Sequence, residues 1–168
     1  MSDAIVNRVA ESALVTIDLE TFLPPETPAV FDLKDFLFMG LILKEKDYRE
    51  ALKNTDWEAY RNRVVLVTCS ADAILPSWSW MLAASYLRQV TDEICLESVS
   101  AWKTRRLLEN IRQLDATEFT DKRIVIKGCG DTPIPDAAYL EITSKLQPVA
   151  KSILYGEPCS TVPVYKKK

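Results

Sequence analysis

Histidine is absent from the 168 residues of this chain. Catalytic Ser-His and Cys-His pairs, HExxH metal motifs and imidazole zinc ligands are therefore excluded. Positive charge is not in excess either, because 21 basic and 24 acidic residues leave a net charge of −3. A general nucleic-acid binder needs a basic field, so we expect no nucleic-acid partner. Long apolar runs are also missing. The most apolar stretch, Phe36–Leu43, is less than half the length that crosses a membrane.

The N-terminus, Met1-Ser-Asp-Ala-Ile-Val, lacks the basic, apolar and small-residue order of a signal peptide. We therefore expect a cytoplasmic protein with no membrane partner. In that compartment the four cysteines are reduced thiols or metal ligands. The length fits one domain over residues 1–168, whose core is large enough to need no disulfides.

Two stretches share one pattern, Arg63-Val-Val-Leu-Val-Thr-Cys69 and Arg123-Ile-Val-Ile-Lys-Gly-Cys129. Their cysteines lie 60 residues apart (129 − 69). A short apolar run closed by turn-forming residues indicates a buried strand that runs into a loop. If the two strands are parallel, both thiols lie at the carboxyl edge of one sheet, where open α/β sheets bind ligands.

Strand and helix patterns alternate along the chain. Strands are predicted at 13–19, 64–68, 93–97, 124–127 and 152–155, and helices at about 36–52, 77–89, 100–114 and 136–146. A Pro-rich connection ends the N-terminal segment 1–30, and 156–168 is expected to be a loop or tail. This order predicts an α/β fold, with a three-layer, mostly parallel sheet and helices on both faces. If the strand at Ile94 and the strand Ile124–Lys127 flank Val64–Thr68, the switch point falls between the strands ending at Cys69 and Cys129.

The apolar segment Phe36–Leu43 presents large side chains on too many sides for a surface helix. Burial in the core and burial in a homodimer interface explain this equally well. A homodimer through Phe36–Leu43 is therefore one expectation for the partner of this chain.

Three cysteines lie in predicted loops beside Gly, Ser or Pro, namely Cys69, Cys129 and Cys159, whereas Cys95 lies inside a strand and is expected to be inert. If the C-terminal loop folds back, the three thiols converge. Neighbouring thiolates repel one another, so the three thiols either remain neutral or are held by a cation. Zinc or an iron–sulfur cluster fits a thiolate site without histidine. The fourth ligand would be Asp72, Asp131, Glu157 or an exogenous group, although the spacing matches no standard CxxC pattern.

Other functions remain open for the same loops. Their backbone donors could bind a small ligand or anion without chemistry, and the residues predicted to line that site are Gly128, Gly130, Asp131, Asp72 and Lys127. In a cysteine-dependent enzyme, Cys69 or Cys129 would be the nucleophile, and Asp72, Asp131 or Lys127 would transfer protons. The competing class is a non-catalytic structural or interaction protein with buried thiols. Metal or small-ligand binding through the cysteine cluster is the most specific prediction.

Four motifs carry a resemblance to known sequences: Phe31-Asp-Leu-Lys-Asp-Phe-Leu, Cys69-Ser-Ala-Asp72-Ala-Ile-Leu-Pro76, Lys127-Gly-Cys129-Gly-Asp131 and Gly156-Glu-Pro-Cys159-Ser-Thr-Val-Pro163. Through them the chain resembles, over nearly its whole length, an uncharacterised bacterial protein family best represented in Bacteroidetes. The resemblance implies a small bacterial cytoplasmic protein. It implies no reaction, substrate or catalytic residue.

Overall fold

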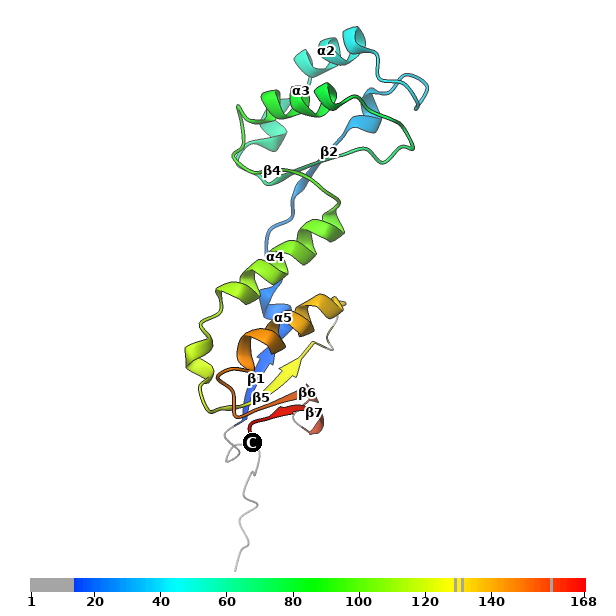
Figure 1. Cartoon of the computed structure of the whole chain (residues 1–168). Coiled ribbons are helices and arrows are strands. Elements are labelled where there is room, and N and C mark those ends of the chain that lie inside the picture. Colours follow the sequence, from blue (N-terminus) through cyan, green and yellow to red (C-terminus); the bar gives the residue numbers. More distant parts are fainter. Residues whose placement is uncertain (1–13, 129, 131, 158) are drawn as a thin grey trace, which may run out of the picture. The chain divides into compact units, whose positions relative to one another are not determined.

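The chain forms two compact units in a computed structural model that describes residues 14–128, 130, 132–157 and 159–168 (Figure 1). Unit 1 comprises the chain up to Pro24 and from Lys103 onward, and unit 2 comprises Pro25–Trp102. Unit 2 is therefore inserted into unit 1. None of the helices in these ranges is both long enough and apolar enough to cross a membrane.

Unit 1 holds a four-stranded sheet in the order β1-β5-β6-β7. Its strands are β1 (Leu14–Asp18), β5 (Arg123–Lys127), β6 (Ser152–Glu157) and β7 (Ser160–Lys166). The first three are parallel, and β7 is antiparallel to β6. The helices associated with this sheet are α4 (Val99–Gln113), α5 (Asp136–Leu146) and the short 3-10 helices η1 (Leu19–Phe22) and η4 (Ala116–Phe119). The predicted loop at 156–168 is thus largely the strand β7, because turn-forming residues close a tight β6–β7 hairpin.

Unit 2 holds a three-stranded parallel sheet in the order β2-β3-β4. Its strands are β2 (Ala29–Asp32), β3 (Val65–Thr68) and β4 (Ile94–Leu96). The helices of this unit are α2 (Glu45–Lys53), α3 (Ser77–Leu87) and the 3-10 helices η2 (Leu33–Phe36) and η3 (Trp57–Tyr60).

The α/β class and the mostly parallel pairing are confirmed, but the strands form two sheets instead of one. The strand at Ile94 pairs with β3 as predicted. The other side of β3 is taken by β2, whose four residues are too short to give a clear strand signal. Because β5 belongs to the other sheet, no switch point lies between β3, before Cys69, and β5, before Cys129.

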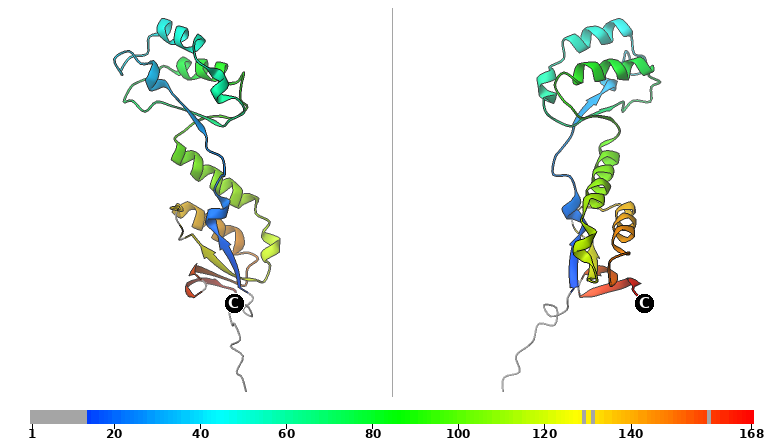
Figure 2. Two further views of the ribbon diagram at one scale, coloured as in Figure 1. Left: turned by 180° about the vertical axis from the view of Figure 1, so that it is seen from behind. Right: turned by 60° about the vertical axis from the view of Figure 1, so that its left-hand side comes forward.

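Among the described residues, both long helices of each unit pack against the same face of its sheet. In unit 2, side chains of α2 and α3 pack against alternate residues of β2 and β3, including Phe31, Val65 and Val67. Figure 2 shows these two helices side by side over one face of the unit 2 sheet. In unit 1, α4 and α5 pack in the same way against Ile124 and Ile126 of β5. The expected arrangement of helices on both faces of a single sheet is therefore not found.

The two units repeat one another. Helix α5 follows Pro135 and α3 follows Pro76, an offset of 59 residues (135 − 76). The same offset relates β6 to β4 (153 − 94) and η4 to η3 (116 − 57). Strand β2 with η2 repeats β1 with η1 at an offset of 14 (32 − 18), as Asp-Leu-x-x-Phe-Leu. The cores correspond as well, with Leu87 and Leu146 fully buried at the same position of α3 and α5.

Aspartate starts the 3-10 helices of both units. Each capping carboxylate accepts a hydrogen bond from the backbone N–H two residues later, at 2.9–3.1 Å, and the four residues are Asp18, Asp32, Asp56 and Asp115. This is the usual N-cap arrangement, which satisfies a backbone donor that the helix leaves unpaired. The helix that Asp32 caps has only one turn.

The predicted helix over 36–52 is wrong in its first half. Phe38 and Ile42 pair as an antiparallel bridge, and Leu41 N–H donates to Phe38 C=O at 3.2 Å. Met39 and Gly40 have φ values of 53° and 71°, as in the type I′ turn of a tight hairpin. A positive φ is uncommon for methionine, so the residue types did not reveal this turn. Helix α2 begins only at Glu45.

Candidate functional site

The predicted thiol site is not assembled in the part of the chain that the structure describes. Cys69 belongs to unit 2 and is half-buried, whereas Cys159 is exposed at the β6–β7 turn of unit 1. Cys129 and Asp131 lie outside the described residues. Within those residues, no three cysteine, aspartate or glutamate side chains form a group that could hold a metal ion. Asp72, a predicted ligand, is exposed in the loop after β3.

Lys127 lies at the end of β5, at the carboxyl edge of the unit 1 sheet. Its Nζ is 3.5 Å from Oε1 of Glu157, which ends the neighbouring strand β6. Both side chains are partly exposed, so the pair contributes only ~0–1 kcal/mol to stability. Lys127 is therefore placed at the predicted edge, with a carboxylate of the same unit beside it.

Gly128 and Gly130 also lie at this edge, and side chains of unit 1 pack closely against both. A Cβ on Gly128 would be 2.1 Å from the hydroxyl of Tyr139, and a Cβ on Gly130 would be 1.8 Å from Oε1 of Glu20. The same Glu20 oxygen accepts a hydrogen bond from Thr132 N–H at 3.3 Å. A side chain at either position would require Tyr139 or Glu20 to move, which glycine avoids.

The corresponding edge of unit 2 is tied together by Asp32. Its Oδ1 accepts hydrogen bonds from Lys34 N–H at 2.9 Å and from Ser70 N–H at 3.0 Å. Partial burial opposes ionisation, but the hydrogen bonds from Ser70 and Lys34 outweigh it and lower the pKa of Asp32. Asp32 thus joins β2 to the loop that carries Cys69. Cys69 itself makes a weak contact, from Sγ to the carbonyl of Ala71 at 3.6 Å.

An apolar surface at the tip of the 38–42 hairpin is the most exposed cluster of large hydrophobic side chains in unit 2. The exposed fractions are 47% for Phe38, 80% for Met39, 64% for Leu41 and 59% for Ile42. Lys44 Nζ lies 3.2 Å from the centre of the Phe38 ring, a cation–π contact. We call Phe38–Ile42 the hairpin tip. The sequence marked this segment as unusually apolar but assigned it to a helix.

A basic groove lies on the unit 1 sheet, away from the carboxyl edge. It has a volume of about 440 Å³ and is lined by four cationic side chains, Arg123, Lys151, Lys166 and Lys167, together with Ser152, Leu154, Pro163 and Tyr165. Lys167 forms an ion pair with Asp121 at 2.9 Å. The sequence analysis missed this groove, because its cations come from three strand ends that are distant along the chain.

Comparison with curated proteins and with solved structures found no significant match. One protein-family model matches residues 3–167, and its description is "Protein of unknown function (DUF2480)". The match covers nearly the whole chain, including both units, and agrees with the resemblance seen in the sequence motifs. The chain therefore belongs to the DUF2480 family, whose function is unknown.

Proposed function

We propose that this chain is a non-catalytic interaction protein that self-associates through the hairpin tip of unit 2. The observation that carries the proposal is the exposure of Phe38, Met39, Leu41 and Ile42 on one tight turn. Large apolar side chains gathered on a surface mark an interaction site. A second copy is the occupant to which we commit.

Charge around the hairpin tip supports pairing between two copies. Asp35, Lys44 and Asp47 lie beside Phe38 in one shallow pocket and are all exposed, so both signs are present on the same rim. In a two-fold interface, where one patch meets itself, such a rim allows each cation to approach a carboxylate of the other copy.

The expected dimer is reversible. Burial of the remaining exposed surface is worth roughly 1–2 kcal/mol for each of the four side chains in each copy. Association costs about 4–15 kcal/mol in lost freedom of motion. The two ranges largely cancel, so we expect a weak dimer that forms only toward the upper end of accessible protein concentrations.

Sedimentation velocity over a concentration series tests this proposal. The double variant Met39→Asn/Leu41→Lys removes the apolar tip and creates an Asn-Gly turn, which favours the type I′ geometry that the hairpin already has. We expect this variant to remain monomeric at concentrations where the parent chain dimerises. Leu140→Lys is the matched control, because Leu140 is 74% exposed on α5 of unit 1. A parent chain that stays monomeric, or a tip variant that dimerises normally, would contradict the proposal.

A second candidate function is binding of a phosphate-bearing small ligand in the basic groove. The specific observation is that four cations line the groove and no carboxylate does, although the chain carries a net negative charge. Arginine and lysine together suit phosphate recognition. Leu154 and Tyr165 offer an apolar surface for the remainder of such a ligand.

Isothermal titration with pyrophosphate at low ionic strength tests the groove. We expect saturable binding that weakens when Arg123→Gln and Lys151→Gln are combined, whereas Lys53→Gln/Lys103→Gln, with the same change in charge, leaves it unchanged. If both double variants weaken pyrophosphate binding equally, the effect is one of overall charge and the groove proposal is contradicted.

The thiol-based metal or ligand site also stays a prediction. It now rests on Cys129, which lies outside the described residues, together with Cys69 and Cys159 from different units. Anaerobic purification followed by elemental analysis for zinc and iron decides it, because a cluster of this kind requires stoichiometric metal.

A further inference from the structure

The described residues of unit 2 include no equivalent of β7, the last strand of the unit 1 sheet. Strand β6 pairs with β5 on one side and with β7 on the other. Its equivalent, β4, pairs with β3 alone among the residues that the structure describes. The position that β7 occupies in unit 1 is therefore an open sheet edge in unit 2.

The backbone of this open edge is arranged as in unit 1. Val65 N–H donates to Glu93 C=O at 2.9 Å. Since alternate residues of a strand direct their backbone groups to opposite sides, the N–H and C=O groups of Ile94 and Leu96 face outward. Their equivalents in β6, Ile153 and Tyr155, lie opposite Tyr165 and Val162 of β7. The outward groups of β4 can thus pair with an antiparallel strand.

A groove beside the open edge repeats as well. In unit 2 it has a volume of about 280 Å³ and is lined by Val67, Trp80, Met81, Ala84, Ile94, Cys95 and Leu96. In unit 1 the groove at the same place has a volume of about 460 Å³, and the equivalent residues Ile126, Tyr139, Leu140, Thr143 and Tyr155 line it. There, Val164 of β7 adds an apolar side chain to the lining. Leu96 is 66% exposed, against 39% for its equivalent Tyr155 in unit 1, whereas Met81 and its equivalent Leu140 are similarly exposed, at 71% and 74%.

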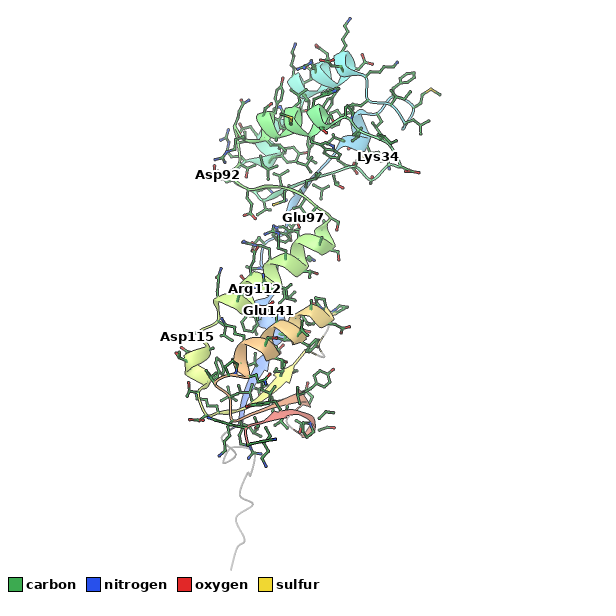
Figure 3. The ribbon with its side chains drawn as sticks, in the orientation of Figure 1. Lys34, Asp92, Glu97, Arg112, Asp115 and Glu141 are labelled. Carbon is green, nitrogen blue, oxygen red and sulfur yellow. The ribbon has the colours of Figure 1, made fainter. Side chains whose placement is uncertain are left out.

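The charges around β4 select the occupant. Asp92 and Glu93 precede the strand and Glu97 follows it, and the stretch from 92 to 98 contains no cation. Figure 3 labels Asp92 and Glu97 at the two ends of β4. Asp92 is paired with Arg88, and Glu97 also has an interaction within the chain, so the acidity of the edge rests mainly on Glu93. If β4 of a second copy paired along the full strand, Glu93 would lie opposite Glu97 of the other copy, which is destabilising.

We propose that the edge of β4 binds an extended, basic segment of a partner protein, antiparallel to β4, as β7 binds β6 in unit 1. The outward backbone groups of Ile94 and Leu96 pair with the segment. A β-branched side chain of the segment enters the groove beside Met81, and its lysine or arginine residues lie near Glu93. This is recognition by strand addition, in which the backbone supplies affinity and the groove supplies selectivity. It does not depend on the hairpin tip.

The probe is a fluorescent peptide with the sequence of Ser160–Lys168 of this chain, which combines β-branched residues with three lysines. Its fluorescence anisotropy is measured against the full-length protein. We expect saturable binding. N-methylation at the peptide positions of Val162 and Tyr165, which blocks pairing but keeps charge and composition, should weaken it by at least about tenfold.

Two matched variants show where the peptide binds. Met81→Lys changes the β4 groove and should weaken binding at least about tenfold, whereas Leu140→Lys, at the equivalent position of unit 1, should leave it unchanged. If Leu140→Lys weakens peptide binding and Met81→Lys does not, the peptide replaces β7 on β6 and the proposal fails. Absence of binding, or equal binding of the N-methylated peptide, also overturns it. A peptide with glutamate in place of its lysines that binds as tightly would refute the basic character of the partner.

Discussion

Replacing Asp32 with alanine should destabilise unit 2 considerably more than replacing Asp56 does. Both residues cap a 3-10 helix of unit 2, η2 and η3 respectively. Among the described residues, Asp56 accepts one backbone hydrogen bond through its carboxylate, from Glu58 N–H at 3.1 Å. Asp32 accepts two, and the second, from Ser70 N–H, joins elements 38 residues apart.

The magnitude follows from these bonds. Loss of an N-cap costs about 1 kcal/mol, so Asp56→Ala should lower the free energy of unfolding of unit 2 by about that amount. Asp32→Ala loses the cap and also a hydrogen bond to a charged group, worth about 1.5–3 kcal/mol. The expected cost in unit 2 is therefore about 2–4 kcal/mol.

The effect should also depend on pH. The pKa of Asp32 is lowered in the folded chain, after the opposing effect of burial, by hydrogen bonds from Ser70 and Lys34. A carboxyl group with a lowered pKa contributes stability above its unfolded-state pKa of about 3.9, and this contribution is lost as the pH falls through the folded value. The gap between the parent chain and Asp32→Ala should therefore be full at pH 7 and shrink below about pH 4.

Native-state hydrogen exchange with mass spectrometry measures this unit by unit, because peptides of β3 report on unit 2 and peptides of β5 on unit 1. Asp32→Asn is the control, since its Oδ1 can still accept both hydrogen bonds without the charge. If Asp32→Ala and Asp56→Ala cost the same, the bond to Ser70 contributes nothing and the reasoning is refuted. If the difference in stability between the parent chain and Asp32→Ala does not change with pH, only the electrostatic part of the reasoning is refuted.

Three further predictions concern packing and metal. Gly128→Ala should destabilise unit 1 by about 1–3 kcal/mol, because its Cβ would overlap the Tyr139 hydroxyl; chemical denaturation followed by tyrosine fluorescence checks this. Leu87→Ala and Leu146→Ala, at equivalent fully buried positions, should each cost about 2–5 kcal/mol, with faster hydrogen exchange confined to the unit that carries the change; exchange spreading through both units would show one cooperative fold. Dialysis against a chelator should leave the melting temperature unchanged if the thiols are inert, and a fall would support the metal site.

Much of the secondary structure could be predicted from residue patterns. The strands at Leu14–Asp18 and Arg123–Lys127 and the helices at Ser77–Leu87 and Asp136–Leu146 agree with expectation to within a few residues. Their apolar periodicity is local and strong. The pairing of strands is not local, and the short strand β2 gave no signal of its own, so the division into two sheets could not be read from the chain.

The prediction of a shared thiol site depended on aligning the two motifs on their cysteines, and this alignment differs by one residue from the structural one. Aligned on their cysteines, the two motifs are 60 residues apart, but Pro76 and Pro135, which begin equivalent helices, are 59 apart. The structural equivalent of Cys69 is therefore Gly128. The similarity of the two motifs reflects a repeated strand and loop, and it does not by itself place two thiols at one edge.

The insertion of unit 2 has a consequence for synthesis on the ribosome. Strand β2 meets its partner β3 after 36 residues (65 − 29), whereas β1 must wait for β5 over 109 residues (123 − 14). Domains form as the chain emerges, so β3 is made before β5. During that interval β1 has no partner of its own and can compete with the similar strand β2 for β3. Side-chain shape favours β2 over β1 as the partner of β3. The ring of Phe31 in β2 stacks on Trp57 and meets Tyr60 edge-on, at centroid distances of 5.4 and 5.7 Å. Ile17, its counterpart in β1, has no ring and cannot make these contacts.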